Sequence, residues 1–289
     1  MYTGIYHPKQ ILHYMKPQKI KRVFYYLFHD GIRGVSKVLD DRMLMGSDLK
    51  LELVVKKQIT GNSIKDYPEI VFKGAENPLV SIIIPVYNQF DYTYACLRSI
   101  FENTGDINYE IIIADDCSND LTKNICEVVK GIHVEKTQGQ SYFLRNCNHA
   151  AKAAKGKYIV FLNNDTQVQE NWLKPLVDLM ERDSKIGMAG SCLVYPDGRL
   201  QEAGGILWKD GSAWNFGNGH NPAMPEYRYV KDVDYISGAA IMIRHDLWNE
   251  LGGFDETFAP AYCEDSDLHF LCGKRVSGSI SAIIRSSSF

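Results

Sequence analysis

The 289-residue sequence lacks an excess of positive charge: 32 lysines and arginines stand against 35 aspartates and glutamates, and the formal net charge is −3. Protein binding to nucleic acid depends mainly on basic side chains that neutralise phosphates. The overall balance therefore excludes a general electrostatic case for a nucleic-acid partner. The charge is unevenly distributed, because residues 1–46 carry eight lysines and arginines against three aspartates, a net charge of +5.

The sequence also lacks closely spaced cysteines and long apolar runs. Its seven cysteines form an odd set without a C-x-x-C pair, which argues against a disulfide framework or a zinc site and is typical of a reducing compartment. No apolar run reaches the roughly 18 residues of a membrane span, and the start of the chain has no signal-peptide core. We therefore expect a soluble, cytoplasmic protein. The basic residues 1–46 either contact anionic lipid peripherally, at the inner face of the cell membrane, or pack as a helical appendage.

Residues 19–45 place apolar side chains at helical spacing, which predicts helices interrupted near Gly31 and Gly34. With the mixed residues 46–78 they make a basic helical extension and linker over residues 1–78. From residue 79 onward, short apolar segments alternate with helical ones. The predicted strands cover residues 80–85, 109–114, 132–135, 158–162 and 187–194. Four helices are predicted: one that begins near Asp91, one over residues 121–130, an alanine-rich one that ends near Lys155, and one over residues 170–182.

This alternation is typical of an α/β fold with a mostly parallel sheet and helices on both faces, here over residues 79–272. Such sheets bind ligands beyond the carboxyl ends of their strands, so the residues after each strand are the candidates for a site. Pro85 ends the first predicted strand, and Tyr87 and Asn88 follow it. The aromatic ring there either stacks on a planar base or belongs to an ordinary turn.

Carboxylates follow the second strand and the strand over residues 158–162. Asp115 and Asp116 either accept hydrogen bonds from a base or ribose, or cap the next helix. Asn163, Asn164 and Asp165 form either a capped turn or a site for Mg²⁺ or Mn²⁺ bound together with a diphosphate. Because oxygen-rich side chains recur at several strand ends, the sequence favours a functional site over separate turns.

A further carboxylate pair, Glu264 and Asp265, lies at the predicted start of a helix near the C-terminus. Negative charge at that position favours the helix N-terminus. A crowded carboxylate pair also suits general-base chemistry, because crowding raises the pKa of one member.

In chain order, the motifs SIIIPVYN, IIIADDCSND, FLRNCNHAAKAAKGKYIVFLNND, ISGAAIMIRHDLWNELGGFDE and AYCEDSDL resemble glycosyltransferase family 2. The resemblance covers residues 79–270 and implies the GT-A fold, which is Rossmann-like. It is a resemblance to bacterial enzymes that build surface polysaccharides. The implied reaction is an inverting transfer from a nucleotide-diphosphate sugar to a hydroxyl of a glycan or lipid-linked glycan.

The resemblance also implies roles for individual residues. Asp265 would be the catalytic base, with Glu264 the less favoured choice, and Asp165 would ligate Mg²⁺ or Mn²⁺. Asn163 and Asn164 stand where the family usually has aspartate, so one anionic ligand remains and the metal would depend more on the diphosphate. The implied nucleotide-sugar-binding residues are Pro85, Tyr87, Asn88, Asp115, Asp116, Arg145 and Asn164.

The resemblance ends near residue 273, and residues 275–289 contain six serines. One choice of synonymous codons for residues 275–289, read one base later, encodes GYQVVYQPLSEVVHF, which resembles the family's ending and includes its late histidine. We infer that residues 273–289 are an aberrant, frameshifted tail. The chain is then expected to lack a closing strand and a metal-binding histidine, and to have low or no activity.

Two alternatives to an active transferase remain. One is a catalytically inactive fragment or a sugar-nucleotide-binding module. The other, a nucleotidyltransferase, is disfavoured because VYNQFD at residues 86–91 lacks the glycine-rich basic loop of that class. The sugar, the base and the acceptor depend on residues 195–233, where Trp208 and Trp214 either stack on a sugar or belong to the core.

Overall fold

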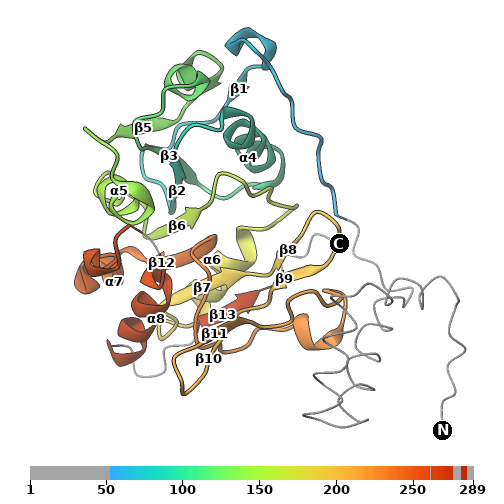
Figure 1. Cartoon of the computed structure of the whole chain (residues 1–289), viewed down its shortest axis with the longest axis vertical. Coiled ribbons are helices and arrows are strands. Elements are labelled where there is room, and N and C mark those ends of the chain that lie inside the picture. Colours follow the sequence, from blue (N-terminus) through green and yellow to red (C-terminus); the bar gives the residue numbers. More distant parts are fainter. Residues whose placement is uncertain (1–52, 261, 276–280, 285–289) are drawn as a thin grey trace, which may run out of the picture. The chain divides into compact units, whose positions relative to one another are not determined.

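The computed structural model describes residues 53–260, 262–275 and 281–284 (Figure 1). Contacts within the chain divide it into residues 1–50 and residues 51–289. The helices predicted within residues 19–45, and the lipid contact predicted for residues 1–46, lie outside the described residues. Among the residues that are described, no helix combines the length and the apolar character needed to cross a bilayer.

A seven-stranded sheet forms the centre of the fold, in the order β13-β7-β12-β6-β2-β3-β5. Its pairings are parallel except those of β12, which is antiparallel to both β6 and β7. The sheet is thus mostly parallel, which confirms the predicted fold class. Its strands are β2 (Val80–Val86), β3 (Tyr109–Asp115), β5 (His133–Lys136), β6 (Tyr158–Leu162), β7 (Met188–Ser191), β12 (Ala240–Arg244) and β13 (Ser281–Ile284).

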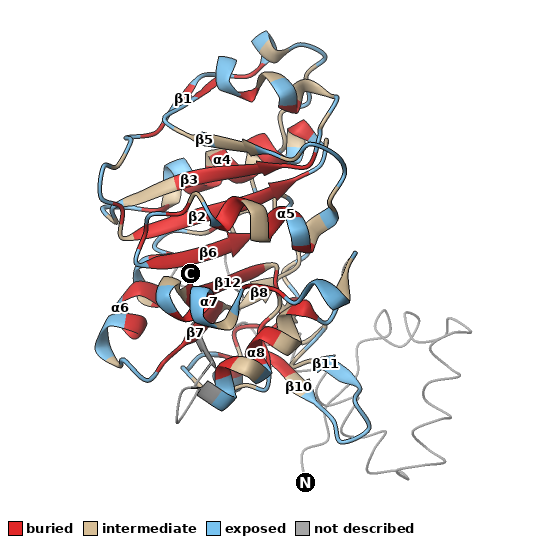
Figure 2. Ribbon diagram, turned by 90° about the vertical axis from the view of Figure 1, so that its left-hand side faces the viewer, coloured by how far each residue is buried: buried red, intermediate tan, exposed pale blue. Residues whose placement is uncertain are grey.

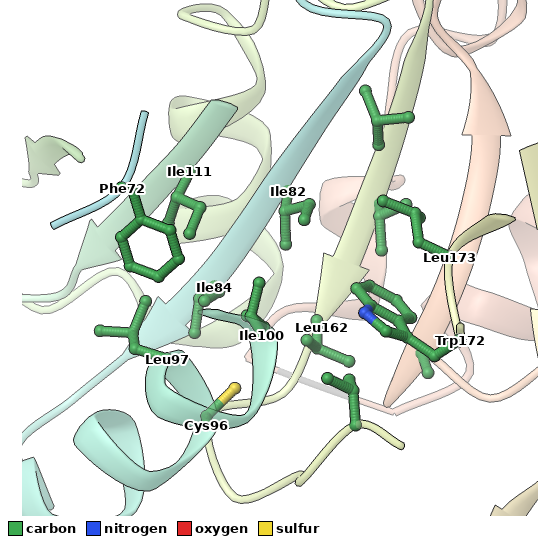
Figure 3. Packing of buried hydrophobic residues seen from close by; sticks show 14 of the residues in the cluster. Phe72, Ile82, Ile84, Cys96, Leu97, Ile100, Ile111, Leu162, Trp172 and Leu173 are labelled. Carbon is green, nitrogen blue, oxygen red and sulfur yellow. The ribbon is translucent and has the colours of Figure 1, made fainter. Parts of the chain in front are cut away.

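The central strands are buried on both faces because their sequences are continuously apolar (Figure 2). Since successive side chains of a strand point to opposite faces, neighbouring isoleucines enter different cores. Ile82 and Ile84 pack in one core with Ile111 (Figure 3), whereas Ile83 and Ile112 pack in the other. The sheet therefore needs helices on both sides.

Five helices supply this cover. Side chains of α4 (Phe90–Asn103) and α6 (Lys174–Arg182) contribute to the first core. Side chains of α5 (Tyr142–Ala151), α7 (His245–Leu251) and α8 (Glu264–Arg275) contribute to the second. Figure 1 shows α4 and α5 on opposite sides of β2 and β3, as the predicted two-sided cover requires.

Two predicted helices differ from the observed ones. The segment predicted as a helix over 121–130 is a 3-10 helix, η3 (Leu121–Glu127), followed by β4 (Val129–Lys130). Its end is drawn into extended structure because β4 pairs in parallel with β1 (Ile70–Val71). The alanine-rich helix ends at Ala151 rather than near residue 155, because the N–H groups of Lys155 and Gly156 donate to the Ser81 hydroxyl instead.

Part of the segment assigned to the linker packs on the sheet. It contains the 3-10 helix η2 (Ile64–Asp66) and β1. Tyr67, Ile70 and Phe72 are buried in the first core. Residues 64–72 therefore share a core with the sheet.

Short elements connect β7 with β12 and β12 with α8. They are β8 (Leu193–Val194), β9 (Leu200–Glu202), β10 (Gly205–Leu207), β11 (Ala213–Asn215), η4 (Pro225–Tyr227) and η5 (Glu256–Phe258). β8 pairs with β9 and β10 with β11, both antiparallel. Trp208 directly follows β10 and Trp214 lies on β11; they are 48% and 63% exposed and so are not core residues.

The C-terminal strand corrects one expectation. Residues 273–289 are predicted to leave the sheet without a closing strand, yet β13 pairs in parallel with β7 at the edge. Edge pairing requires backbone groups rather than particular side chains, and the short run Ala282-Ile283-Ile284 has a composition compatible with a strand.

Candidate active site

The reversed direction of β12 brings its first residues to the carboxyl end of β6. Ala240 pairs with Leu162, and the Asn163 N–H donates to the Ala239 carbonyl at 3.0 Å. The residues before β12, numbers 237–239, form a tight turn that is called the 237–239 turn below. This turn therefore lies directly beside the loop that carries Asp165.

Asp265 is held against the same turn from the start of α8. Its carboxylate accepts a hydrogen bond from the Gly238 N–H at 3.0 Å and another from the Ser266 N–H at 2.7 Å. Glu264 is 7% exposed, and burial raises the pKa of its carboxyl. One Glu264 oxygen is buried without a hydrogen-bond partner. Of the two carboxylates, Asp265 is the more accessible and the more firmly oriented.

Asp116 anchors the start of α5. Its carboxylate accepts hydrogen bonds from the Thr137 hydroxyl at 2.9 Å, from the N–H and hydroxyl of Ser141 at 2.7 and 2.8 Å, and from the Tyr142 N–H at 2.8 Å. Asp116 is only 3% exposed. Both oxygens thus have donors within the protein, and the contact of Asp116 with a base or ribose stays a prediction.

The start of α5 also reaches the 237–239 turn. The ring of Phe143 lies 3.6 Å from the position that a Cβ on Gly238 would take, and the Asp265 Cβ lies 3.8 Å from it. The loop that carries Asp165 and the starts of α5 and α8 consequently meet around one turn, and Asp116 is connected to it through its hydrogen bonds to the start of α5.

The loops after β2 and β3 are tied together by Asn88. Its backbone has a positive φ of 56°, its N–H donates to the Ser118 hydroxyl at 2.7 Å, and its side-chain oxygen accepts from the Asn119 N–H at 2.8 Å. Tyr87, its neighbour, is 48% exposed. The aromatic ring predicted to stack on a base is therefore accessible at this edge of the sheet.

Pro85 and Asp115 lie beneath this edge. Both are buried, and the Asp115 carboxylate accepts from the Ser118 N–H at 2.9 Å and lies 3.7 Å from the Lys136 ammonium. Asp115 therefore supports the loop that carries Asp116. Its direct contact with a nucleotide stays a prediction.

The loop after β6 presents Asp165 outward. Asn164 donates to the Thr93 hydroxyl of α4 at 3.0 Å, which fixes the loop, while Asp165 is exposed and accepts no hydrogen bond from the described residues. Across those residues, no three histidine, cysteine, aspartate or glutamate side chains gather as a metal cluster. Asp165 therefore fits as a single protein ligand for a cation that takes its other oxygens from a diphosphate and water.

Arg145, on α5, forms an ion pair with Glu256 of η5. The Nε–Oε2 distance is 3.1 Å, and the two side chains are 50% and 61% exposed. Because exposed ion pairs contribute little free energy, Arg145 can exchange Glu256 for another anion. Its role as a donor ligand stays a prediction.

Glu202, at the end of β9, is a further buried carboxylate that is not among the predicted site residues. This side chain is 1% exposed; one oxygen accepts from the Ser237 N–H at 3.1 Å, and the other is buried without a partner. Burial, assisted by the charge of Asp265, raises the Glu202 pKa to about 7. No local signal in the sequence identifies it, because Ser237, its hydrogen-bond partner, lies 35 residues away.

His269 is a second buried ionisable group on α8. It is 7% exposed, and desolvation lowers its pKa, so the neutral imidazole is favoured. The negative charges of Asp234 and Asp265 act in the opposite direction. His269 thus belongs to the charged surroundings of Asp265 without a direct part in the geometry above.

The mostly parallel sheet, with carboxylates gathered at its strand ends, is the GT-A fold of sugar transferases. The crystal structure of GalNAc-T7 with UDP, GalNAc and Mn²⁺ matches 73% of this chain and 44% of that chain, with 19% identity and a TM-score of 0.58. The mannosyltransferase PcManGT from Pyrobaculum calidifontis, in complex with GDP-Man and Mn²⁺, matches 75% of this chain and 60% of that chain, with 18% identity and a TM-score of 0.51.

The chain belongs to glycosyl transferase family 2, whose family model matches residues 81–251. The O-antigen biosynthesis protein RfbC of Myxococcus xanthus is 28% identical over 193 residues, which are 63% of this chain and 15% of RfbC. The chain spans 22% and 50% of the length of two other curated relatives.

Proposed function

We propose that the chain is an inverting glycosyltransferase that moves a sugar from a nucleotide-diphosphate sugar to a hydroxyl of a bacterial surface glycan, free or lipid-linked. The observation that carries the proposal is the meeting of the Asp165 loop, Asp265 and the start of α5, which Asp116 anchors, at the 237–239 turn. Membership of the family and the name of RfbC, which refers to O-antigen biosynthesis, support the class of acceptor.

In the proposed reaction, Asp265 removes the proton of the acceptor hydroxyl while that oxygen attacks the anomeric carbon. The bond between the anomeric carbon and the diphosphate breaks on the opposite face, and the diphosphate leaves with the bonding electrons. One displacement inverts the anomeric configuration. The Gly238 and Ser266 N–H groups hold the base in position, which reduces the entropy that must be lost in the transition state.

The donor is proposed to lie along the ends of β2, β3 and β6. The exposed ring of Tyr87 stacks on the base, and Asp116 and Arg145 border the ribose and phosphates. Asp165 would hold Mg²⁺ or Mn²⁺, which when bound stabilises negative charge on the departing diphosphate. The Mn²⁺ in both structural neighbours supports a divalent cation.

The proposal is tested by measuring nucleoside diphosphate release from a panel of nucleotide sugars, with and without Mn²⁺. Asp265→Asn is expected to lower turnover by about 10²- to 10⁴-fold while donor binding is retained, because it removes the base alone. Asp178→Asn, which changes an exposed aspartate of α6, serves as the matched control. Donor binding without any turnover, in this chain and also in a chain with the GYQVVYQPLSEVVHF ending, would instead indicate a sugar-nucleotide-binding module.

The tail hypothesis is tested beside it. A chain that ends in GYQVVYQPLSEVVHF in place of residues 275–289 is expected to turn over donor faster than the present chain, because it restores the late histidine. Equal turnover by the two chains would contradict the proposed frameshift effect and leave the assignment of Asp265 unaffected.

A further inference from the structure

Two consecutive backbone N–H groups hold two different carboxylates in this molecule. The Ser237 N–H donates to Glu202 at 3.1 Å, and the Gly238 N–H donates to Asp265 at 3.0 Å. Glu202 comes from β9 and Asp265 from α8, so the 237–239 turn links the two elements. Any displacement of the Ser237 amide moves the donor that orients Asp265.

The segment before the turn is packed too tightly to move independently. An added Cβ on Gly205 would lie 1.8 Å from the Tyr235 ring, and one on Gly190 would lie 2.2 Å from the Ile236 side chain. Both distances are far shorter than any real contact between carbon atoms. The space beside each glycine is therefore already filled by the neighbouring Tyr235 or Ile236 side chain. Tyr235 and Ile236 therefore leave little room for the chain before the turn to shift.

The surroundings of Glu202 leave its charge poorly compensated. The titratable groups that face it are Asp265 on α8, Tyr235 before β12 and Cys192 between β7 and β8. Burial raises the pKa of both Tyr235 and Cys192 to about 12, with Glu202 adding to each effect, so both are neutral at physiological pH. Lys231 faces Cys192 and is the nearby cation.

We propose that Glu202 is a positioning residue for Asp265, and that its protonation state sets, through the Ser237 and Gly238 amides, how the base is held. The role of Asp265 as base rests on the proposed function; the link between the two carboxylates rests on the contacts alone. When Glu202 loses its proton, its bond to the Ser237 N–H becomes charge-assisted and therefore stronger, and a like charge arises beside Asp265.

The link is tested without turnover, by following the amide signals of Ser237 and Gly238 in ¹H–¹⁵N spectra of the full chain between pH 5 and 9. Both amides are expected to shift with one common midpoint near pH 7, the pKa of Glu202. Glu202→Gln keeps the acceptor for Ser237 and removes the ionisation, so both shifts should disappear. Asp178→Asn should leave them as in the unmodified chain.

Two results would overturn the proposal: a Gly238 amide that keeps its midpoint in Glu202→Gln, or a Ser237 amide that titrates while Gly238 does not. Asp265→Asn gives a reciprocal check, because loss of its charge should lower the midpoint at Ser237; an unchanged midpoint would also count against the link. The comparison of Ser237 with Gly238 and the reciprocal check do not require a Glu202 variant that folds, since they use only the unmodified chain and Asp265→Asn.

Turnover supplies an independent readout. In the unmodified chain kcat is expected to rise near pH 7 as Glu202 loses its proton. Glu202→Gln should lower kcat about tenfold and abolish this rise, with KM for the donor unchanged. An unaltered kcat and pH profile would contradict the positioning role. Absence of turnover both in the unmodified chain and in the chain that ends in GYQVVYQPLSEVVHF would contradict the proposed function, whereas the amide titrations would still decide whether Glu202 and Asp265 are linked.

Discussion

Asp116 shows how one side chain can support the architecture at the place where a ligand is expected. Its four hydrogen bonds come from Thr137, Ser141 and Tyr142, and two of the donors are N–H groups at the start of α5. Helix starts have unsatisfied N–H groups, and a carboxylate also complements their partial positive charge. The carboxylate thus fixes the helix whose Phe143 borders Asp265.

Asp116→Ala is therefore expected to lower the free energy of unfolding by about 3 kcal/mol in the absence of any nucleotide, since several buried donors lose their acceptor. Denaturant unfolding measures the effect, and Asp106→Ala, at an exposed position, is the control. If Asp116 only bound the nucleotide, both variants would have the stability of the unmodified chain.

Glu202 predicts a pH dependence of stability. Its pKa is raised from 4.5 to about 7 in the folded chain, so the folded state binds the proton more tightly than the unfolded state does. The resulting stabilisation is complete below about pH 4.5 and is lost as the pH rises through about 7, a change of up to roughly 3 kcal/mol.

The measurement compares free energies of unfolding of the unmodified chain and Glu202→Gln at several pH values. The difference should shift in favour of the variant between about pH 4.5 and 7 and then level off. A difference that is constant across this range would show that Glu202 has the same affinity for protons in both states.

At the scale of elements, the sequence predicts those helices and strands best whose structure is determined by their own residues. The continuous apolar runs of β2, β3 and β6 are long enough to define buried strands without knowledge of their neighbours. The direction of β12 could not be predicted, because an apolar strand has the same pattern whether its partners are parallel or antiparallel. The extended end after η3 depends on β1, a segment more than fifty residues away.

The residues of the candidate site also differ in whether the sequence alone could identify them. Tyr87, Asp116, Asp165 and Asp265 could be named because each lies in a local motif beside a strand or helix end. Glu202 could not, because its importance comes from contacts with Ser237 and the neighbourhood of Asp265, which only the packed chain creates. Contacts between residues that are far apart in the sequence cannot be predicted from short motifs.

Close packing beside the 237–239 turn gives a prediction for β7. Gly190→Ala would place a Cβ 2.2 Å from the Ile236 side chain, which has no free space because Ile236 is 1% exposed. Overpacking of this kind typically costs about 1–3 kcal/mol. Thermal unfolding should show the loss, whereas Gly74→Ala, where an added Cβ meets no atom within 4 Å, should be close to neutral.

At the scale of the whole molecule, one sheet separates two cores, and both must be filled. Ile83 and Ile84 are neighbours in β2, each fully buried, and they belong to different cores. A sheet with one face in solvent would tolerate truncation of one of the pair.

Ile83→Ala and Ile84→Ala are both expected to lower the free energy of unfolding by about 2–5 kcal/mol, because each leaves a cavity in a closed core. Val71→Ala, at a 55% exposed position in β1, is the control and should have a small effect. Denaturant unfolding of the three variants measures this, and a large cost at only one isoleucine would contradict two cores of equal importance.

Finally, the antiparallel pairing of β12 with β6 determines which parts of the chain can vary. The placement of the Asp165 loop beside Asp265 depends on the register of β12 with β6 and on the Gly238–Asp265 hydrogen bond, not on the length of the polypeptide that connects them. Insertions in the loop between β10 and β11 can therefore alter the neighbouring surface without breaking the hydrogen bonds of Ser237 and Gly238. That hairpin can vary while the contacts around Asp265 are retained.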